Sequence, residues 1–238
     1  MGALDKIVFG TMSISNKSSS IKLLNFALNN FKVFHLSSEY KSFNLVSKMI
    51  KKKKKTNLIL KLAEPNFDFT RFSSKRFLKK LEFYQKKVGK DKQLYIQWMW
   101  RGDLKNENAR INNFVKDSKK ISSLFKRLTK KKIKKIYLFP YTKSFLNTSI
   151  NLNFLNNVCI YRNPKEKEYE NFISKFKRLR FIAIRPFGGK LRLLKKHKLK
   201  YLLNYSINNK NITKIILTCS KIKQIQDIIS YCNDKKNI

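Results

Sequence analysis

The stretch "KIVFGT" at residues 6–11, followed by "SSSIKLLNFALNN" at residues 18–30, contains the unit from which the fold is built. An uninterrupted run of Ile, Val and Phe is typical of a strand that is buried on both faces. The second stretch opens with serines that can cap a helix, and its apolar residues share one helical face: Ile21, Leu24, Ala27 and Leu28. The pair predicts a strand followed by a helix.

The same pattern recurs along the chain. Further apolar runs that predict strands lie at 32–36, 57–63, 93–100, 134–140, 156–161, 180–187 and 213–218. Segments with helical spacing lie at 42–50, 73–87, 110–129, 165–176, 198–208 and 220–231, and an irregular segment follows 134–140. Eight such units predict an α/β protein with a (β/α)8 TIM barrel, short loops and one domain over 1–238, without a C-terminal extension. A doubly wound sheet is the alternative, but it normally has fewer strands, and no G-x-G-x-x-G follows the first one.

The composition is strongly basic, with 55 Lys and Arg against 14 Asp and Glu and a formal charge of +41. A hydrophobic content of 42% excludes a disordered chain. The charge suits a polyanion partner such as nucleic acid, and it also suits a solvated surface covered with lysine. Both explanations stay open. The lysine runs at 51–55 and 130–135 are expected at helix ends or in the turns of the barrel's bottom face.

The spacing of the cysteines indicates a reducing compartment, and the lengths of the apolar runs indicate a protein without a membrane span. Cys159, Cys219 and Cys232 lie far apart, without a C-x-x-C pair or a neighbouring histidine, so no metal site is expected. No apolar stretch approaches the roughly 18 residues needed to span a bilayer. The N-terminus lacks the pattern of a signal peptide. We therefore expect a cytoplasmic protein without a membrane span.

In a (β/α)8 barrel the working residues follow the carboxyl ends of the strands. The second predicted strand ends in "VFHLSSEY" at 33–40, and the third contains Lys61. The fourth ends in "WMWR" at 98–101, and the seventh in "RPFGG" at 185–189. These segments are expected to form one rim.

Several of these segments, in this order, resemble the aldo-keto reductases, which are NAD(P)H-dependent oxidoreductases on a (β/α)8 barrel. "IVFGTM" is similar to that family's first strand, "ALNNFKVFHLSSEY" to the segment that carries its tyrosine, and "LILKL" to the strand that carries its lysine. "RFIAIRPFGGKL" and "ITKIILTCSKIKQIQDII" resemble the seventh strand and the last strand and helix.

The resemblance implies site residues. The family's catalytic Tyr falls on Tyr40, which would donate a proton to the substrate carbonyl, and its Lys falls on Lys61, which would lower the pKa of that phenol. The family's Asp falls on His35 and its His on Trp98 or Met99, so half of the catalytic tetrad is substituted. His35 is a third candidate catalytic residue, and the alternative for it is a partly buried polar residue at the rim.

Trp98, Met99 and Trp100 are candidates to contact the substrate, and the two indoles could stack on a nicotinamide, sugar or base. The alternative is that these side chains pack in the core or at the barrel mouth, as aromatics of a parallel strand more often do.

The resemblance also implies a nicotinamide cofactor, NADP or possibly NAD, and no metal. The cofactor-binding positions are expected to be Gly10, Thr11, Arg185, Phe187, Gly188, Ser220, Lys221 and Gln224. The family's Ser-Asn pair after the fifth strand falls on Phe139 and Pro140.

Three functions are compatible with the sequence. The first is reduction of an aldehyde, ketone or sugar. The second is a catalytically degraded barrel that serves as a binding or partner protein. The third is binding of nucleic acid or another polyanion through the positive charge.

Overall fold

The strands form a closed barrel in which each is parallel to its neighbours, in the order β1 to β8. The computed structural model describes residues 2–131 and 133–234. The strands are β1 Ile7–Gly10, β2 Val33–Leu36, β3 Asn57–Ala63, β4 Leu94–Met99, β5 Ile133–Phe139, β6 Asn157–Tyr161, β7 Arg180–Ile184 and β8 Ile212–Leu217. β1 closes the barrel against β8, with Ile7 opposite Ile215 and Phe9 opposite Leu217. The predicted (β/α)8 barrel is confirmed.

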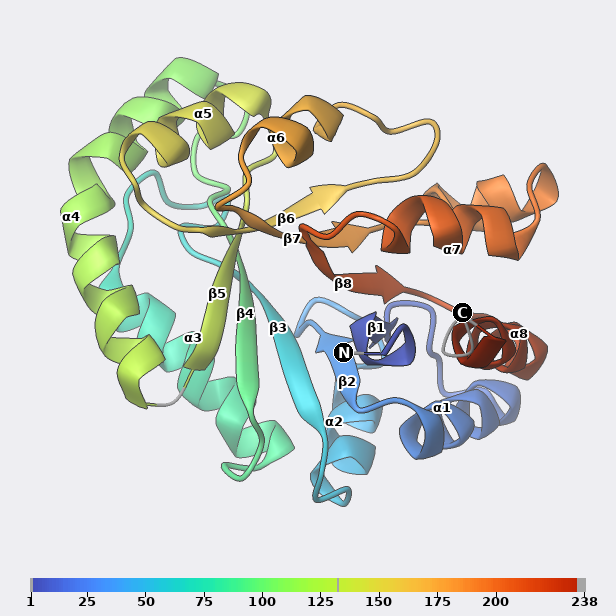
Figure 1. The fold of residues 1–238 in the computed structure, drawn as a ribbon. Coiled ribbons are helices and arrows are strands. Elements are labelled where there is room, and N and C mark those ends of the chain that lie inside the picture. Colours follow the sequence, from blue (N-terminus) through green and yellow to red (C-terminus); the bar gives the residue numbers. More distant parts are fainter. Residues whose placement is uncertain (1, 132, 235–238) are drawn as a thin grey trace.

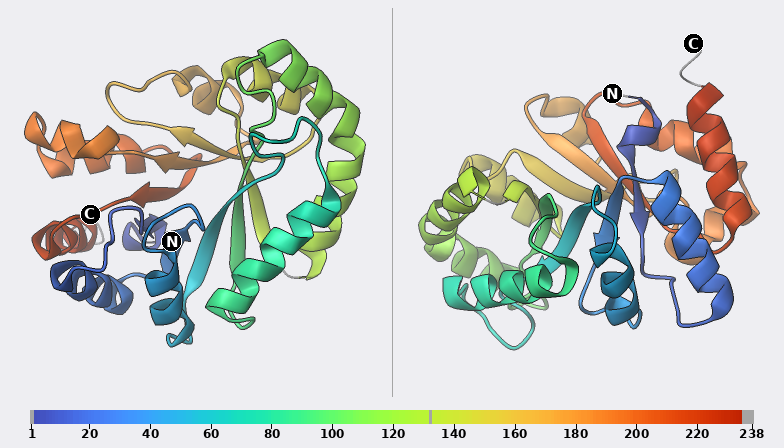
Figure 2. Two further views of the ribbon diagram at one scale, coloured as in Figure 1. Left: turned by 180° about the vertical axis from the view of Figure 1, so that it is seen from behind. Right: turned by 90° about the horizontal axis from the view of Figure 1, so that it is seen from below.

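The helices form the outer layer around the strands (Figure 1, Figure 2). They are α1 Ser18–Asn30, α2 Phe43–Lys51, α3 Ser74–Val88, α4 Glu107–Lys131, α5 Lys143–Asn151, α6 Glu170–Lys175, α7 Leu199–Ile207 and α8 Ile222–Asp234. Two 3-10 helices, η1 Leu4–Lys6 and η2 Gly189–Lys195, lie before β1 and before α7. None of the helices within the described ranges is long and apolar enough to cross a membrane.

The segment after β5 was expected to be irregular and is instead helix α5. Thr142 caps it, because its hydroxyl oxygen accepts a hydrogen bond from the Phe145 N–H at 3.2 Å. Phe145, Leu146 and Ile150 form its buried face. Apart from Lys143, the remaining positions hold Asn, Ser and Thr, which have low helix propensity, so packing rather than composition stabilises this helix.

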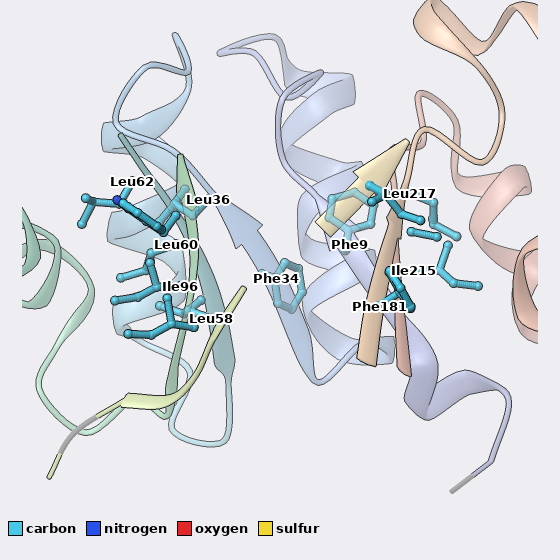
Figure 3. Packing of buried hydrophobic residues seen from close by; sticks show 14 of the residues in the cluster. Phe9, Phe34, Leu36, Leu58, Leu60, Leu62, Ile96, Phe181, Ile215 and Leu217 are labelled. Carbon is cyan, nitrogen blue, oxygen red and sulfur yellow. The ribbon is translucent and has the colours of Figure 1, made fainter. Parts of the chain in front are cut away.

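Side chains alternate along each strand between two apolar layers. The larger layer lies between strands and helices, and Figure 3 shows part of it, including Phe9, Phe34, Leu60, Ile96 and Leu217. The smaller layer fills the barrel interior and includes Val8, Ile59, Met99, Tyr137 and Ile182. A residue's phase on its strand therefore decides whether it can reach the interior.

Candidate active site

A cavity of about 950 Å³ opens at the carboxyl ends of the strands. This volume lies within the range of sites for small molecules and cofactors. The predicted site residues among its lining are Gly10, His35, Tyr40, Lys61, Met99, Arg185, Phe187 and Gly188. The structure therefore brings together predicted residues from five strands or the loops after them, as expected for this architecture.

Tyr40, His35 and Gln97 form a hydrogen-bonded row in the cavity. The Tyr40 hydroxyl lies 3.4 Å from His35 Nδ1, and His35 Nε2 lies 2.7 Å from Gln97 Oε1. Because the Gln97 oxygen can only accept, Nε2 carries the imidazole proton and Nδ1 accepts from the phenol. Gln97 was not predicted. Its position two residues before Met99 on β4 places it on the same interior face, and this spacing is the signal that could have identified it.

Burial keeps His35 neutral. The side chain lies inside the barrel wall, and its pKa is lowered to about 4, chiefly by burial and further by the positive charge of Lys61. The hydrogen bond to Gln97 acts in the opposite direction. His35 is therefore a hydrogen-bond acceptor toward Tyr40 at neutral pH and not a second cation beside Lys61.

Glu39 supplies the negative charge that the substituted Asp position lacks. Its Oε2 accepts a hydrogen bond from Lys61 Nζ at 2.7 Å, and both of its oxygens accept from the Arg101 guanidinium. Burial opposes ionisation of Glu39, but the bonds and charges of Arg101 and Lys61 outweigh it, so its pKa lies below the ordinary value. We call Glu39, Lys61 and Arg101 the rim cluster.

The loops after β2 and β4 bring the rim cluster together. The Glu39 N–H donates to Ser37 Oγ at 3.2 Å, which orders the turn after β2. Arg101 also donates from Nε to the Tyr141 hydroxyl at 2.9 Å. The next residue is Gly102, where any side chain would collide with the Phe69 carbonyl oxygen. Neither partner of Glu39 could be identified from sequence spacing, because Lys61 lies on β3 and Arg101 lies in the loop after β4, and both have to approach the turn after β2.

Tyr40 lies near both Lys61 and Glu39. Lys61 Nζ lies 5.7 Å from the centre of the Tyr40 ring and is bonded to Glu39. Burial, followed by the charge of Glu39, raises the pKa of Tyr40. The phenol therefore stays protonated at neutral pH. The effect of Lys61 on this pKa stays a prediction, and the charge of Glu39 acts against it.

Arg185 and its neighbours form the opposite wall. The Arg185 backbone has φ of 57°, and its guanidinium carbon lies 4.1 Å from the centre of the Tyr161 ring. Its carbonyl oxygen accepts from Asn163 Nδ2 at 2.9 Å. Gly188 has φ of 73°, a conformation that favours glycine. The space beside the Gly189 backbone is empty: a Cβ added to this glycine would have no atom within 4 Å. Because Gly189 also lines the cavity, its backbone is open to a ligand there.

Four predicted cofactor residues lie outside the cavity lining. Thr11 is fully buried and donates its hydroxyl to the His35 carbonyl oxygen at 2.9 Å. At the start of α8, Gln224 Oε1 accepts from the backbone N–H groups of Ser220 and Lys221 at 2.8 and 3.1 Å. Free N–H groups at the start of a helix can bind a phosphate, so Gln224 would have to move before these two could do so.

Trp98 and Trp100 also lie outside the cavity lining. Both are fully buried between the barrel and the helices, where Trp98 packs against Phe125 with ring centres 5.1 Å apart. Trp98 Nε1 donates to the Glu64 carbonyl oxygen at 2.7 Å. Met99 alone of the three lines the cavity. The alternative of core packing is therefore the one that the structure shows for the two indoles, because their positions along β4 and after it point them outward, away from the cavity.

Phe139, Tyr141 and Tyr161 form an aromatic wall of the cavity. The ring centre of Phe139 lies 4.7 Å from that of Tyr141 and 5.2 Å from that of Tyr161. Phe139 therefore occupies the end of β5 with a ring instead of the polar side chain of the family pattern. Among the described residues, no group of three or more His, Cys, Asp or Glu could hold a metal ion.

Comparison with known proteins identifies the fold. No family profile and no curated protein matches the sequence. The aldo/keto reductase of Brucella melitensis is 18% identical with a TM-score of 0.66, covering 94% of this chain and 87% of that chain. The aldose reductase of Giardia lamblia is 12% identical with a TM-score of 0.63, covering 97% and 87%.

A third solved structure contains a cofactor. A mutant of the protein Gox0644 in complex with NADPH is 14% identical with a TM-score of 0.64, covering 96% of this chain and 88% of that chain. These similarities extend over nearly the whole barrel. The chain therefore has the fold of the aldo-keto reductases, and the resemblance drawn from its sequence is confirmed at the level of the fold.

Proposed function

We propose that this protein is an NAD(P)H-dependent reductase of an aldehyde, ketone or sugar, with Tyr40 as the proton donor. The observation that supports this most is the position of the Tyr40 hydroxyl in a large cavity at the catalytic end of the barrel, 3.4 Å from His35 Nδ1. The aldo-keto reductase fold gives the proposal its reaction class. Fold alone does not specify chemistry, so the argument rests on the residues of the cavity.

The cavity fits a dinucleotide cofactor by volume, charge and backbone access. Arg185 and Arg192 lie in its lining and can balance phosphate charge. The open backbone at Gly189 permits a close approach by a ligand. We infer that the segment 185–189 and Gly10 hold the cofactor. NAD(P)H, when bound, supplies the hydride for reduction of the carbonyl carbon.

The residues of the chain supply the proton and the orientation. Tyr40 is protonated and can donate to a carbonyl oxygen as negative charge develops there. In the free protein its hydroxyl faces His35 Nδ1, so the hydroxyl has to turn toward the substrate oxygen. Gln97 lines the cavity, and its amide N–H groups can donate to the same oxygen while its Oε1 holds His35.

The raised pKa of Tyr40 favours one direction of the reaction. Reduction needs the phenol, whereas oxidation of an alcohol needs the phenolate as a base. Burial and Glu39 together disfavour the phenolate. We therefore propose that the protein works as a reductase and is a poor alcohol dehydrogenase at neutral pH.

The test is a thermal-shift titration with NADPH and NADH, followed by assay of cofactor oxidation with a panel of aldehydes, ketones and sugars. A ligand that binds only the native state at 100 times its Kd should raise the melting temperature by roughly 5 to 10 °C. We expect this rise together with oxidation that depends on the carbonyl compound. Absence of both would contradict the proposal.

A barrel that binds without catalysing is the second candidate. It is favoured by the substitution of the family's Asp by His35 and by the raised pKa of Tyr40. A melting-temperature rise with NADPH, without turnover of any carbonyl, would favour this candidate over the reductase.

The rim cluster gives a prediction about the pH dependence of the reductase. Because the charge of Glu39 raises the pKa of Tyr40, Glu39→Gln should lower that pKa and move the alkaline loss of reductase activity to lower pH. The pH profile of kcat/KM measures this shift. Glu166→Gln is the matched control, since Glu166 lines the cavity beside Arg185. If Glu39→Gln and Glu166→Gln shift the pH profile of kcat/KM equally, Glu39 is not the charge that sets the pKa of Tyr40.

A further inference from the structure

The barrel concentrates lysine at the end opposite the cavity. Three stretches of sequence, 51–55, 86–94 and 130–135, contain fourteen lysines and a single acid, Asp91. They lie at the turns from α2 to β3, from α3 to β4 and from α4 to β5. Since all strands are parallel, these turns lie at the amino ends of the strands, away from the cavity. We call the described lysines of these stretches the basal patch.

Contacts between the turns make the patch continuous. Lys92 is buried, and its Nζ donates to the Lys53 carbonyl oxygen at 2.7 Å. The same Nζ pairs with Asp91 at 2.7 Å, so the acid within the three stretches is already bound to a lysine. The first residues of β4 and β5 are paired through Leu94 and Ile133. The lysines at 51–55 and at positions 86, 87, 90, 130, 131 and 134 are exposed.

Several acids of the chain lie at the opposite end of the barrel from the basal patch. Glu39, Glu64, Asp103 and Glu166 lie in loops or strand ends at the cavity end. Glu64 is fully buried and pairs with Arg76 at 2.7 Å and Lys80 at 3.0 Å. Within the three basal stretches, by contrast, lysines outnumber acids fourteen to one.

Stabilisation of helices explains only part of this arrangement. A cation in the last turn of a helix interacts favourably with the helix dipole, but the effect ends within that turn. Lys52 to Lys55 and Lys90 lie beyond the ends of α2 and α3. Their mutual repulsion destabilises the compact state unless anions approach.

From this we propose that the basal patch binds the phosphate backbone of duplex nucleic acid without sequence specificity. Lysine is a flexible point charge that suits phosphate contacts and does not read bases. None of the exposed large apolar side chains among the described residues lies within the three stretches. Phe83, just before the second stretch, is exposed and its ring centre lies 5.8 Å from Lys87 Nζ. One ring at the edge of the patch does not form the series of stacking side chains typical of single-strand binders, and the described part of the three stretches lacks the exposed apolar residues that insert into a membrane surface. This inference does not depend on the proposed reductase activity.

The experiment is a fluorescence-anisotropy titration of a labelled mixed-sequence DNA duplex at several salt concentrations. The basal variant replaces Lys52, Lys54, Lys86, Lys90 and Lys130 by glutamine. The control variant replaces five exposed lysines at the cavity end, Lys17, Lys165, Lys167, Lys195 and Lys196, by glutamine. Both variants lose the same charge, so any difference between them reports the location of the patch and not the net charge.

We expect tight binding at low salt, with log K falling linearly with log salt by about 0.9 for each phosphate neutralised. The basal variant should bind at least about 10-fold more weakly and with a shallower slope, while the control stays within about 2-fold. Circular dichroism melting of both variants reports that they are folded. Equal weakening in both variants, no binding by the wild type, or tighter binding to anionic lipid vesicles than to the duplex would overturn the proposal.

Discussion

Tyr40→Phe should lower kcat for carbonyl reduction by about 100-fold or more, because general acid catalysis contributes a factor of about 100 to 10,000. The substitution removes only the hydroxyl that lies 3.4 Å from His35 Nδ1 and leaves the ring that packs edge-on against the imidazole. Cofactor affinity and melting temperature should stay close to those of the wild type. The measurements are steady-state kinetics and the thermal shift with NADPH.

Tyr161→Phe is the matched control for this substitution. Tyr161 also lines the cavity, and its ring supports Arg185, a contact that phenylalanine retains. We expect kcat to change by less than a factor of about 3 in this variant. If Tyr40→Phe retains the turnover of the wild type, another group protonates the carbonyl and the role given to Tyr40 is wrong.

Acid should destabilise the protein through His35. The pKa of His35 is about 4 in the folded protein and 6.5 in the absence of burial. Between these values the unfolded chain binds the proton and the folded protein does not, so stability decreases as the pH falls through this window. The difference corresponds to about 3 kcal/mol in the free energy of unfolding. Well above pH 6.5 His35 is neutral in both the folded and the unfolded state, so the protein has its full stability with respect to this group.

Urea unfolding at pH 7 and at pH 4.5 measures the effect. His35→Asn removes the titrating group, and the loss of stability between the two pH values should be smaller by about 2 to 3 kcal/mol than in the wild type. The chain has only two histidines, and His197→Asn is the control that should leave the wild-type loss unchanged. Equal losses in the wild type and in His35→Asn would show that burial of His35 does not determine the acid sensitivity.

The barrel could be predicted from the sequence because each strand is a short apolar run and each helix shows its own spacing. Helix α5 could not, since its polar residues resemble a loop and only its packing reveals the buried face of Phe145 and Ile150. The positions of Tyr40 and Lys61 followed from strand ends. The outward direction of Trp98 did not, because a continuous apolar strand gives no sign of which residues face the interior.

The charge arrangement of the site depends on tertiary contacts. His35 indicated that the family's acid is substituted, but not that Glu39 provides a carboxylate from the following turn. That role requires Lys61 from β3 and Arg101 from the loop after β4 to meet at one point. The same holds for Gln224, whose bonds to the N–H groups of Ser220 and Lys221 depend on the local turn before α8.

The most direct measurement of the proposed function follows deuterium from the cofactor to the product. NADPH deuterated at the reactive carbon of the nicotinamide ring is incubated with the protein and a carbonyl substrate, and the alcohol is examined by mass spectrometry. The reductase with Tyr40 as proton donor predicts one deuterium in the alcohol formed by the wild type and little alcohol formed by Tyr40→Phe. Binding of NADPH without deuterated alcohol from any carbonyl in the panel would contradict it.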